Sequence, residues 1–272
     1  TQEIIGGKAT HPVCGIPGGM SKPLAEEDRA KIEEWSKELV NFAKFTAGLL
    51  DDVVLKNEAY LGLIKDPGIY YHETYYMGMV DKNNKINFYD GDIRVVDQKG
   101  KEFVKFKPAD YLQHIGEHVE PWSYEKFTFL KKIGWKGFTD GPGSGIYRAA
   151  PLARINASNG FTTPLAQAEY ERMKGFFKDL GVDGPIHHTL VYHWARVIEL
   201  VHAAELMLEC AQDPIITSKD IKANARRRCR CSGGASRYSL PPLCVGRERH
   251  RAGRQPGGRH DQQQRPDQSV HQ

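Results

Sequence analysis

Residues 24–56 read LAEEDRAKIEEWSKELVNFAKFTAGLLDDVVLK, and this stretch decides the fold. Mostly apolar side chains recur in it at alternating spacings of three and four, while charged residues fill the other positions: Ile32, Trp35, Leu39, Phe42, Thr46, Leu49 and Val53. This spacing follows one face of an α-helix, and the acids at 26–28 suit the positive end of the helix dipole. We therefore predict a long amphipathic helix over about residues 24–56, whose stripe forms one wall of a helical core.

The hydrophobic period changes between residues 74 and 107. Four short stretches rich in β-branched and aromatic residues occur there, separated by Asn, Asp and Gly: 75–80, 85–89, 93–96 and 103–106. Such stretches are typical of strands, and the short turns between them favour antiparallel neighbours. We predict a small antiparallel meander.

Two more helices are predicted further along the chain. Thr163 is the expected cap of the first, Pro164 its first residue, and it ends near Leu180. The second spans about 186–211, with its inward side chains at Leu190, Trp194, Val197, Ile198 and Val201. The first 23 residues, and the connections around 121–122, 134–135 and 141–143, are expected to be loops. The fold class is thus α+β, mainly helical, with a long-helix core and a small antiparallel β meander.

Composition places the chain among ordinary globular proteins. It has 272 residues, 40% apolar and 26% charged, enough for one large domain or two small ones. No stretch has the roughly 18 consecutive apolar residues of a membrane helix, and the first residues do not resemble an export signal. The five cysteines are an odd and sparse set, which favours a reducing compartment, and we expect a cytoplasmic protein.

Four patterns could carry chemistry, and each has a plainer interpretation that we favour. Glu199 and His202 have the Glu-x-x-His spacing of di-iron bundles, but no second copy exists, so a surface or helix-packing pair is expected. The histidines His187, His188 and His193 are expected to be solvated or hydrogen-bonded. Cys229-x-Cys231 lacks partners at zinc-finger spacing, and the glycines at 141–145 follow no strand and are expected to form a turn.

Positive charge is concentrated at the C-terminal end. Residues 1–225 hold 21 Lys, 6 Arg and 31 acids, a balance of −4, whereas residues 226–272 hold 11 Arg, no Lys and 3 acids, a balance of +8. An Arg-rich arm of this kind is one pattern of nucleic-acid binding. We therefore divide the chain into a domain over 1–225 and an Arg-rich tail over 226–272.

Several stretches of residues 1–225 resemble the large subunits of nickel-iron hydrogenases, in the order expected for that family. They are GGKATHP at 6–12, PGG at 17–19, EHVEPWSY at 117–124, YRAAPLARIN at 147–156, TPLA at 163–166 and ARVIE at 195–199. The resemblance is greatest to the cytoplasmic branch linked to heterodisulfide reductase or to NAD.

The resemblance implies hydrogen activation at a nickel-iron centre held by four thiolates, with electrons leaving through an iron-sulfur small subunit to further electron-transfer subunits. Those thiolates come from two Cys-x-x-Cys pairs, and this chain contains neither pair. No metal ligand is therefore carried over, and the chain as written is expected to be an inactive internal fragment that holds no cofactor. His11 and Arg154 match family motif positions and at most support the centre or pack around it.

The tail has a simple explanation in the genetic code. Read one base later, the codons of residues 233–244 permit EAPRGTLxHHY, and those of 260–271 permit TTNNNAPINQST, both similar to the family. We infer that residues 226–272 are out of frame, that they are disordered for lack of apolar periodicity, and that no nucleic acid is bound. The alternative function is a non-catalytic assembly or electron-transfer subunit of complex I type.

Resequencing the codons for Arg226 to Arg228 should reveal a single-base insertion or deletion relative to a continuous, family-like frame. An unbroken frame in independent reads, with residues 226–272 present in the purified protein, would contradict the frameshift.

Overall fold

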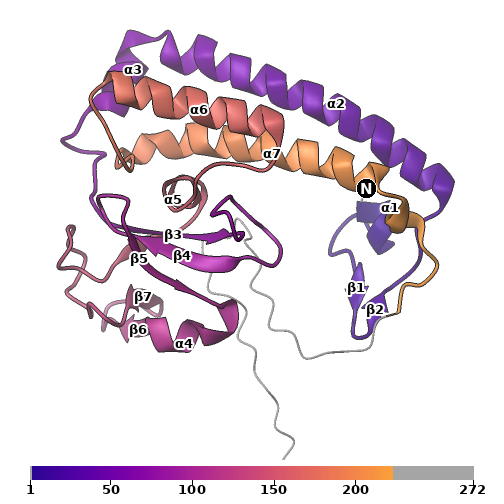
Figure 1. Ribbon diagram of the computed structural model, residues 1–272, viewed down its shortest axis with the longest axis horizontal. Helices are drawn as coiled ribbons and strands as arrows, with labels where there is room; N and C mark the ends of the chain where they lie inside the picture. The colour runs from indigo at the N-terminus through magenta and orange to yellow at the C-terminus, as the bar shows by residue number, and fades with distance from the viewer. Residues whose placement is uncertain (1, 223–272) are drawn as a thin grey trace, which may run out of the picture. The chain divides into compact units, whose positions relative to one another are not determined.

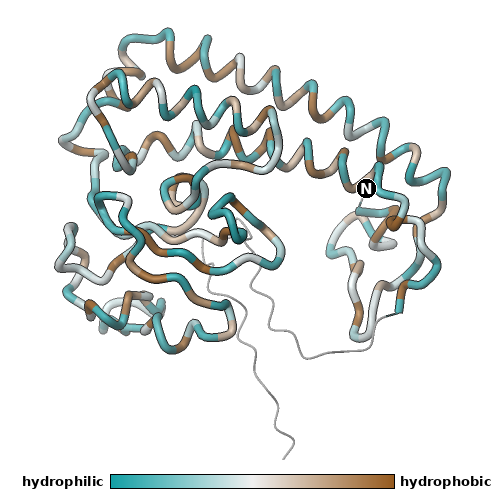
Figure 2. The backbone as a smooth tube through the Cα atoms, viewed as in Figure 1, coloured by the Kyte–Doolittle hydropathy of each residue, from teal (hydrophilic) through white to brown (hydrophobic). Residues whose placement is uncertain are grey.

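The longest helix, α2 (Glu26–Leu50), lies along α7 (Tyr192–Gln212) in the computed structural model, which describes residues 2–222 (Figure 1). Hydrophilic and hydrophobic residues alternate along α2 (Figure 2). Ser36 and Ala43 on α2 are completely buried, and the Ser36 hydroxyl donates to the Ile32 carbonyl at 2.6 Å. Small side chains let two helix backbones approach closely, so this face of α2 is the inner one.

The predicted helix is confirmed, but the predicted inner stripe is wrong in part. Trp35, Phe42, Leu49 and Val53 are exposed. The helix widens into a π-helical turn at Asp51–Leu55 and is followed by α3 (Glu58–Lys65), which was not predicted from the sequence.

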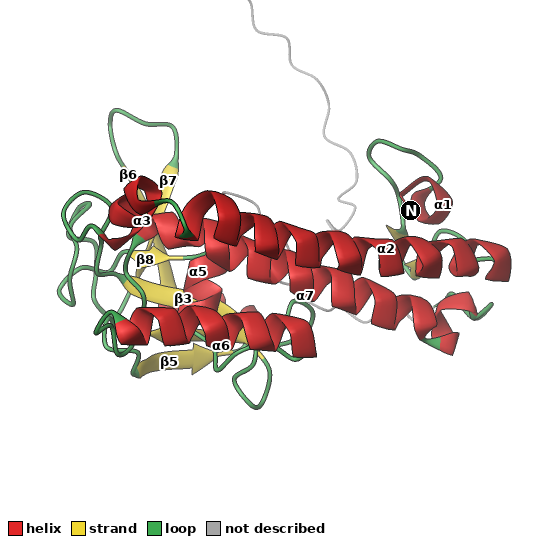
Figure 3. Ribbon diagram, turned by 90° about the horizontal axis from the view of Figure 1, so that it is seen from above, coloured by secondary structure: helices red, strands yellow, loops and turns green. Residues whose placement is uncertain are grey.

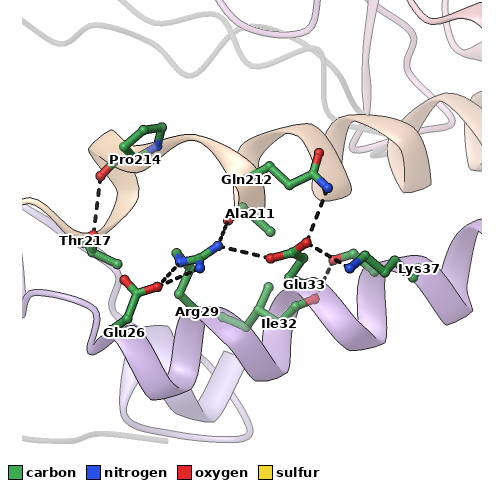
Figure 4. A network of polar contacts seen from close by, with 10 residues as sticks. Glu26, Arg29, Ile32, Glu33, Lys37, Ala211, Gln212, Pro214 and Thr217 are labelled. Atoms are coloured by element: carbon green, nitrogen blue, oxygen red, sulfur yellow. Dashed lines mark hydrogen bonds and ion pairs between the residues drawn. The ribbon is translucent and has the colours of Figure 1, made fainter.

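Hydrogen bonds join the start of α2 to the end of α7, and salt bridges within α2 hold the groups that make them (Figure 4). The Arg29 guanidinium donates to the Ala211 carbonyl at 3.0 Å and to Glu33 at 3.1 Å. Lys37 and Gln212 also donate to Glu33, at 2.9 and 3.3 Å. The hydrogen bond from Lys37 and the other donors lower the pKa of Glu33 to about 2. Arg29 thus satisfies a carbonyl at the C-terminal end of α7, where helix carbonyls lack partners.

The third long helix, α6 (Pro164–Asp179), confirms the helix predicted after Thr163, and it packs on α7 (Figure 3). Thr163 stands at the N-cap position and Pro164 follows it, as predicted, but the Thr163 side chain makes no capping hydrogen bond. The Glu205 carboxylate of α7 instead accepts from the amides of Leu165 and Ala166, at 2.9 and 3.0 Å. A carboxylate at a helix N-terminus supplies both hydrogen bonds and favourable charge.

The main sheet has the order β5-β4-β3-β8. It consists of β3 (Tyr75–Val80), β4 (Asp92–Val96), β5 (Glu102–Phe106) and β8 (Tyr147–Arg148), and β8 alone runs parallel to its neighbour. The predicted strand at 85–89 is wrong, because only Ile86 pairs, in an isolated bridge with Val80. The Asn87 side chain accepts from the amides of Tyr89 and Asp90 and so forms a turn.

A second, unpredicted hairpin follows the short helix α4 (Tyr111–His114), itself preceded by a 3₁₀ turn at Pro108–Asp110. Its strands are β6 (Ile115–Val119) and β7 (Lys126–Leu130). The aromatic residues expected in loops pack against this hairpin: the rings of Phe127 and Phe138 are 4.8 Å apart, and those of Trp135 and Phe138 are 5.1 Å apart.

A short buried helix, α5 (Pro151–Asn156), packs against both β3 and α7. The N-terminal segment holds α1 (Gln2–Gly6), β1 (Gly15–Ile16) and β2 (Gly19–Met20), and 3₁₀ turns occupy Thr189–Val191 and Pro214–Thr217. The predicted α+β, mainly helical class is confirmed. Among the described residues, no helix is long and apolar enough to cross a membrane. The predicted tail, 226–272, lies outside the described residues.

Candidate functional site

Arg154 of α5 forms a buried ion pair with Glu199 of α7. Its Nε and Nη2 atoms lie 2.6 and 2.7 Å from the two carboxylate oxygens, and the side chains are only 7% and 11% exposed. The Phe88 ring lies under the guanidinium at 5.5 Å. This two-pronged geometry suits arginine, and removal from water makes each charge dependent on the other.

The backbone around α5 leaves little freedom for Arg154 to move. Ala150 precedes the helix with a φ of +74°, a conformation unusual for a residue with a side chain. On the other side, a Cβ at Gly78 of β3 would lie 2.9 Å from the Arg154 Cα. Glycine at 78 therefore lets α5 lie directly on the sheet.

Glu199, His202 and Glu205 occupy successive three-residue steps of α7, and we name them the polar ladder. Glu199 pairs with Arg154, His202 Nδ1 shares a 2.8 Å hydrogen bond with the Thr163 hydroxyl, and Glu205 caps α6. Burial lowers the pKa of His202 to about 4, so the ring is neutral at pH 7. Glu199 and His202 were expected to be a surface or a helix-packing pair, and both side chains make packing contacts with neighbouring segments.

His187 and His188 lie in an extended segment ahead of α7, so the predicted start of that helix at 186 is wrong. His187 Nδ1 lies 2.6 Å from the Tyr76 hydroxyl, and its carbonyl accepts from Arg148 at 3.1 Å. The Asn156 amide also holds the Ile186 backbone, with its oxygen accepting at 3.0 Å and its nitrogen donating at 2.9 Å. Three side chains thus fix the segment through four hydrogen bonds, in place of the backbone hydrogen bonds of a helix.

Burial also sets the ionisation of this cluster. It lowers the pKa of His187 and of His188 and raises the pKa of Tyr76. His188 Nδ1 is buried and has no hydrogen-bond partner within residues 2–222, whereas His193, on α7, is exposed. His187, His188 and Tyr76 are therefore uncharged near pH 7.

The two residues taken from the family motifs lie in different parts of the fold. His11 is exposed, with a φ of +51°, in the segment between α1 and β1, while Arg154 is buried beneath α7. Cys14 and Cys210 are free thiols, the first half-buried and the second exposed. Within residues 2–222 no group of three or more His, Cys, Asp or Glu side chains could hold a metal ion.

Sequence reasoning missed Tyr76, Arg148, Asn156 and Glu205. Nothing near Thr163 in the sequence indicates that its hydroxyl bonds to His202 and that Glu205 caps α6 instead. Arg148 and Asn156 both lie within a motif quoted for the resemblance, so the motif marked them without giving their partners.

The described site thus offers buried pairs and hydrogen bonds that fix α5, α6 and α7 together, and the comparisons show which proteins share this scaffold. No protein-family model matches the chain. A solved structure of an NAD⁺-reducing [NiFe]-hydrogenase in the H2-reduced state matches with a TM-score of 0.69 at 28% identity, over 83% of this chain and 47% of that one. The homologues of the chain are hydrogenase subunits, and they support the nickel-iron hydrogenase family.

Among them is an iron-sulfur subunit of the F420-non-reducing hydrogenase of Archaeoglobus profundus, 46% identical over 222 residues, or 81% of this chain and 44% of the relative. A vhu subunit of the F420-non-reducing hydrogenase of Methanocaldococcus jannaschii is 41% identical over 82% of this chain and 49% of its own length. The NAD-reducing hydrogenase HoxS subunit beta of Cupriavidus necator is 32% identical over 78% and 42%. The chain spans about half the length of the curated relatives it matches.

Replacing Arg154 with alanine should lower the free energy of unfolding by about 3–5 kcal/mol, because Glu199 stays buried without a counter-charge. The apolar double variant Arg154→Met/Glu199→Leu should cost less than the single one. Urea denaturation measures both. The matched control is Lys56→Ala, whose pair with Asp52 is 72% and 66% exposed and should cost less than about 1 kcal/mol. Equal losses for Arg154→Ala and Lys56→Ala would contradict the assigned role.

Stability should fall as the pH drops from about 6.5 to about 4, because the unfolded chain takes up a proton on His202 that the folded chain refuses. The slope from this one residue is about 1.4 kcal/mol per pH unit where only the unfolded state is protonated. His202→Asn keeps a partner for Thr163 but cannot titrate, so its urea midpoint should vary less over this range. An unchanged pH slope in His202→Asn would refute the pKa assigned to His202.

Proposed function

We propose that the chain is part of the large subunit of a nickel-iron hydrogenase, in which the complete protein oxidises or evolves hydrogen. The observation that carries the proposal is the 46% identity over 222 residues to a hydrogenase subunit. The TM-score of 0.69 to a [NiFe]-hydrogenase supports the same assignment for the scaffold. In this proposal α2, α5, α6 and α7 are part of the large-subunit scaffold.

In this proposal the ligands of the nickel-iron centre come from residues outside 2–222. A nickel-iron centre with four thiolate ligands needs closely grouped cysteines, and thiolates suit it because they are soft ligands. Residues 2–222 have only Cys14, half-buried just before β1, and Cys210, exposed on α7. The described residues therefore do not fit the centre, and Arg154 acts as a residue that positions α5 against α7.

We further propose that the complete protein, in the cytoplasm, passes electrons through an iron-sulfur small subunit to further electron-transfer subunits. The hydrogenase subunits that this chain resembles imply additional subunits. The physiological acceptor within this group of hydrogenases is set by those partners.

A hybrid tests the proposal. The matching segment of the Archaeoglobus profundus relative is replaced by residues 2–222 of this chain, and hydrogen-dependent viologen reduction is measured after assembly. We expect activity within about tenfold of the parent, because the scaffold is shared, while the 272-residue chain alone should hold no stoichiometric nickel. A folded hybrid that binds nickel without reducing the dye, or one tightly bound nickel on the isolated chain, would overturn the proposal.

A further inference from the structure

One exposed face of α2 carries large apolar side chains at regular spacing. Trp35, Phe42 and Leu49 are seven residues apart and are 43%, 56% and 46% exposed. Phe45 is 63% exposed, and its ring lies 6.3 Å from that of Phe42. A seven-residue spacing is the pattern by which one helix packs along another, and a row of exposed aromatic residues marks an interaction surface.

Two unpaired acids border this row. Glu34 and Glu38 are exposed and make no ion pair or hydrogen bond with any other residue of 2–222, whereas Glu33, just before them, is paired with Arg29 and Lys37. At a spacing of four they lie next to one another on the helix and repel. We name Glu34, Trp35, Glu38, Phe42, Phe45 and Leu49 the α2 outer face.

The lysines of α2 do not neutralise this border. Lys31 pairs with Asp28 and Lys37 pairs with Glu33. Lys44 is two residues beyond Phe42, and a step of about 100° per residue puts it on the side of the helix opposite the apolar row. The α2 outer face is thus apolar with an acidic margin.

We propose that the α2 outer face binds an amphipathic helix of another polypeptide that has an apolar seam and a margin of lysine or arginine. The seam covers Trp35, Phe42 and Leu49, and the cations meet Glu34 and Glu38. A second copy of this chain fits less well. If two copies of α2 pack in parallel, Glu34 and Glu38 of one copy lie against the same acids of the other. If they pack antiparallel, these acids lie near Asp52 of the other copy. The proposal concerns a partner and does not depend on the proposed reaction.

Two synthetic peptides of about 21 residues with the same leucine seam serve as probes, one with lysine and one with glutamate in the flanking positions. Fluorescence anisotropy measures their binding to the full chain at low salt. The lysine peptide should bind at least tenfold more tightly. Glu34→Lys/Glu38→Lys should reverse that preference, and Phe42→Ser should weaken both peptides several-fold.

The controls distinguish binding at the α2 outer face from a general effect of net charge and from other occupants of the face. Asp179→Lys/Glu209→Lys makes the same change in net charge elsewhere, and Leu112→Ser removes another exposed apolar side chain, 60% exposed, so neither should alter binding. Retained preference in Glu34→Lys/Glu38→Lys would overturn the proposal. So would a dimer by light scattering that Phe42→Ser abolishes, since the occupant is then a second copy. Tenfold tighter peptide binding after removal of residues 223–272 would also overturn it, because the tail then covers the face.

Discussion

The polar ladder of α7 is the constraint on which the arrangement of the helices depends. Glu199, His202 and Glu205 are buried or half-buried on a helix that otherwise packs through apolar side chains. A polar group removed from water costs free energy unless it finds a partner, and a carboxylate costs most. Each rung is satisfied by a different part of residues 154–166: a guanidinium, a hydroxyl and two backbone amides. This stretch can therefore lie along α7 in only one register.

The ladder also gives a physical meaning to motifs that are far apart in the sequence. The stretches 147–156, 163–166 and 195–199 resemble hydrogenases as three separate motifs. In the fold they meet, because Arg154 of the first pairs with Glu199 of the third, and the second supplies Thr163 and the amides that complete the ladder. A similarity that preserves all three therefore preserves one buried cluster. The similarity to hydrogenase subunits in these motifs thus concerns the residues that pack the scaffold, and it does not involve metal ligands.

The sequence predicted what depends on periodicity and missed what depends on distant partners. The long helices and three strands of the meander follow from local pattern, and the structure has them. The expected strand at 85–89 has the right composition, yet the Asn87 side chain takes the backbone hydrogen bonds that a strand needs. The predicted helix start at 186 failed for a related reason, since Asn156 and Arg148 hold that segment extended from elsewhere in the chain. Thr163 occupies the predicted cap position, but no local pattern shows that its hydroxyl bonds to His202 instead of the α6 backbone.

The phase of α2 shows how a correct helix can still be placed with the wrong face inward. A stripe of large residues is normally the buried one, and by that rule Trp35, Phe42 and Leu49 face the core. The residues actually buried against α7 include Ser36 and Ala43, and Ala195, Ala204 and Ala211 of α7 are buried as well. Helix axes lie about 8–10 Å apart depending on the side chains between them, so small residues on both sides favour the close end of that range. Close packing with α7, supported by Arg29 and Glu33 at one end, thus leaves the bulky row on the outside. The same choice of small residues that fixes the helix pair also creates the apolar face that remains open on α2.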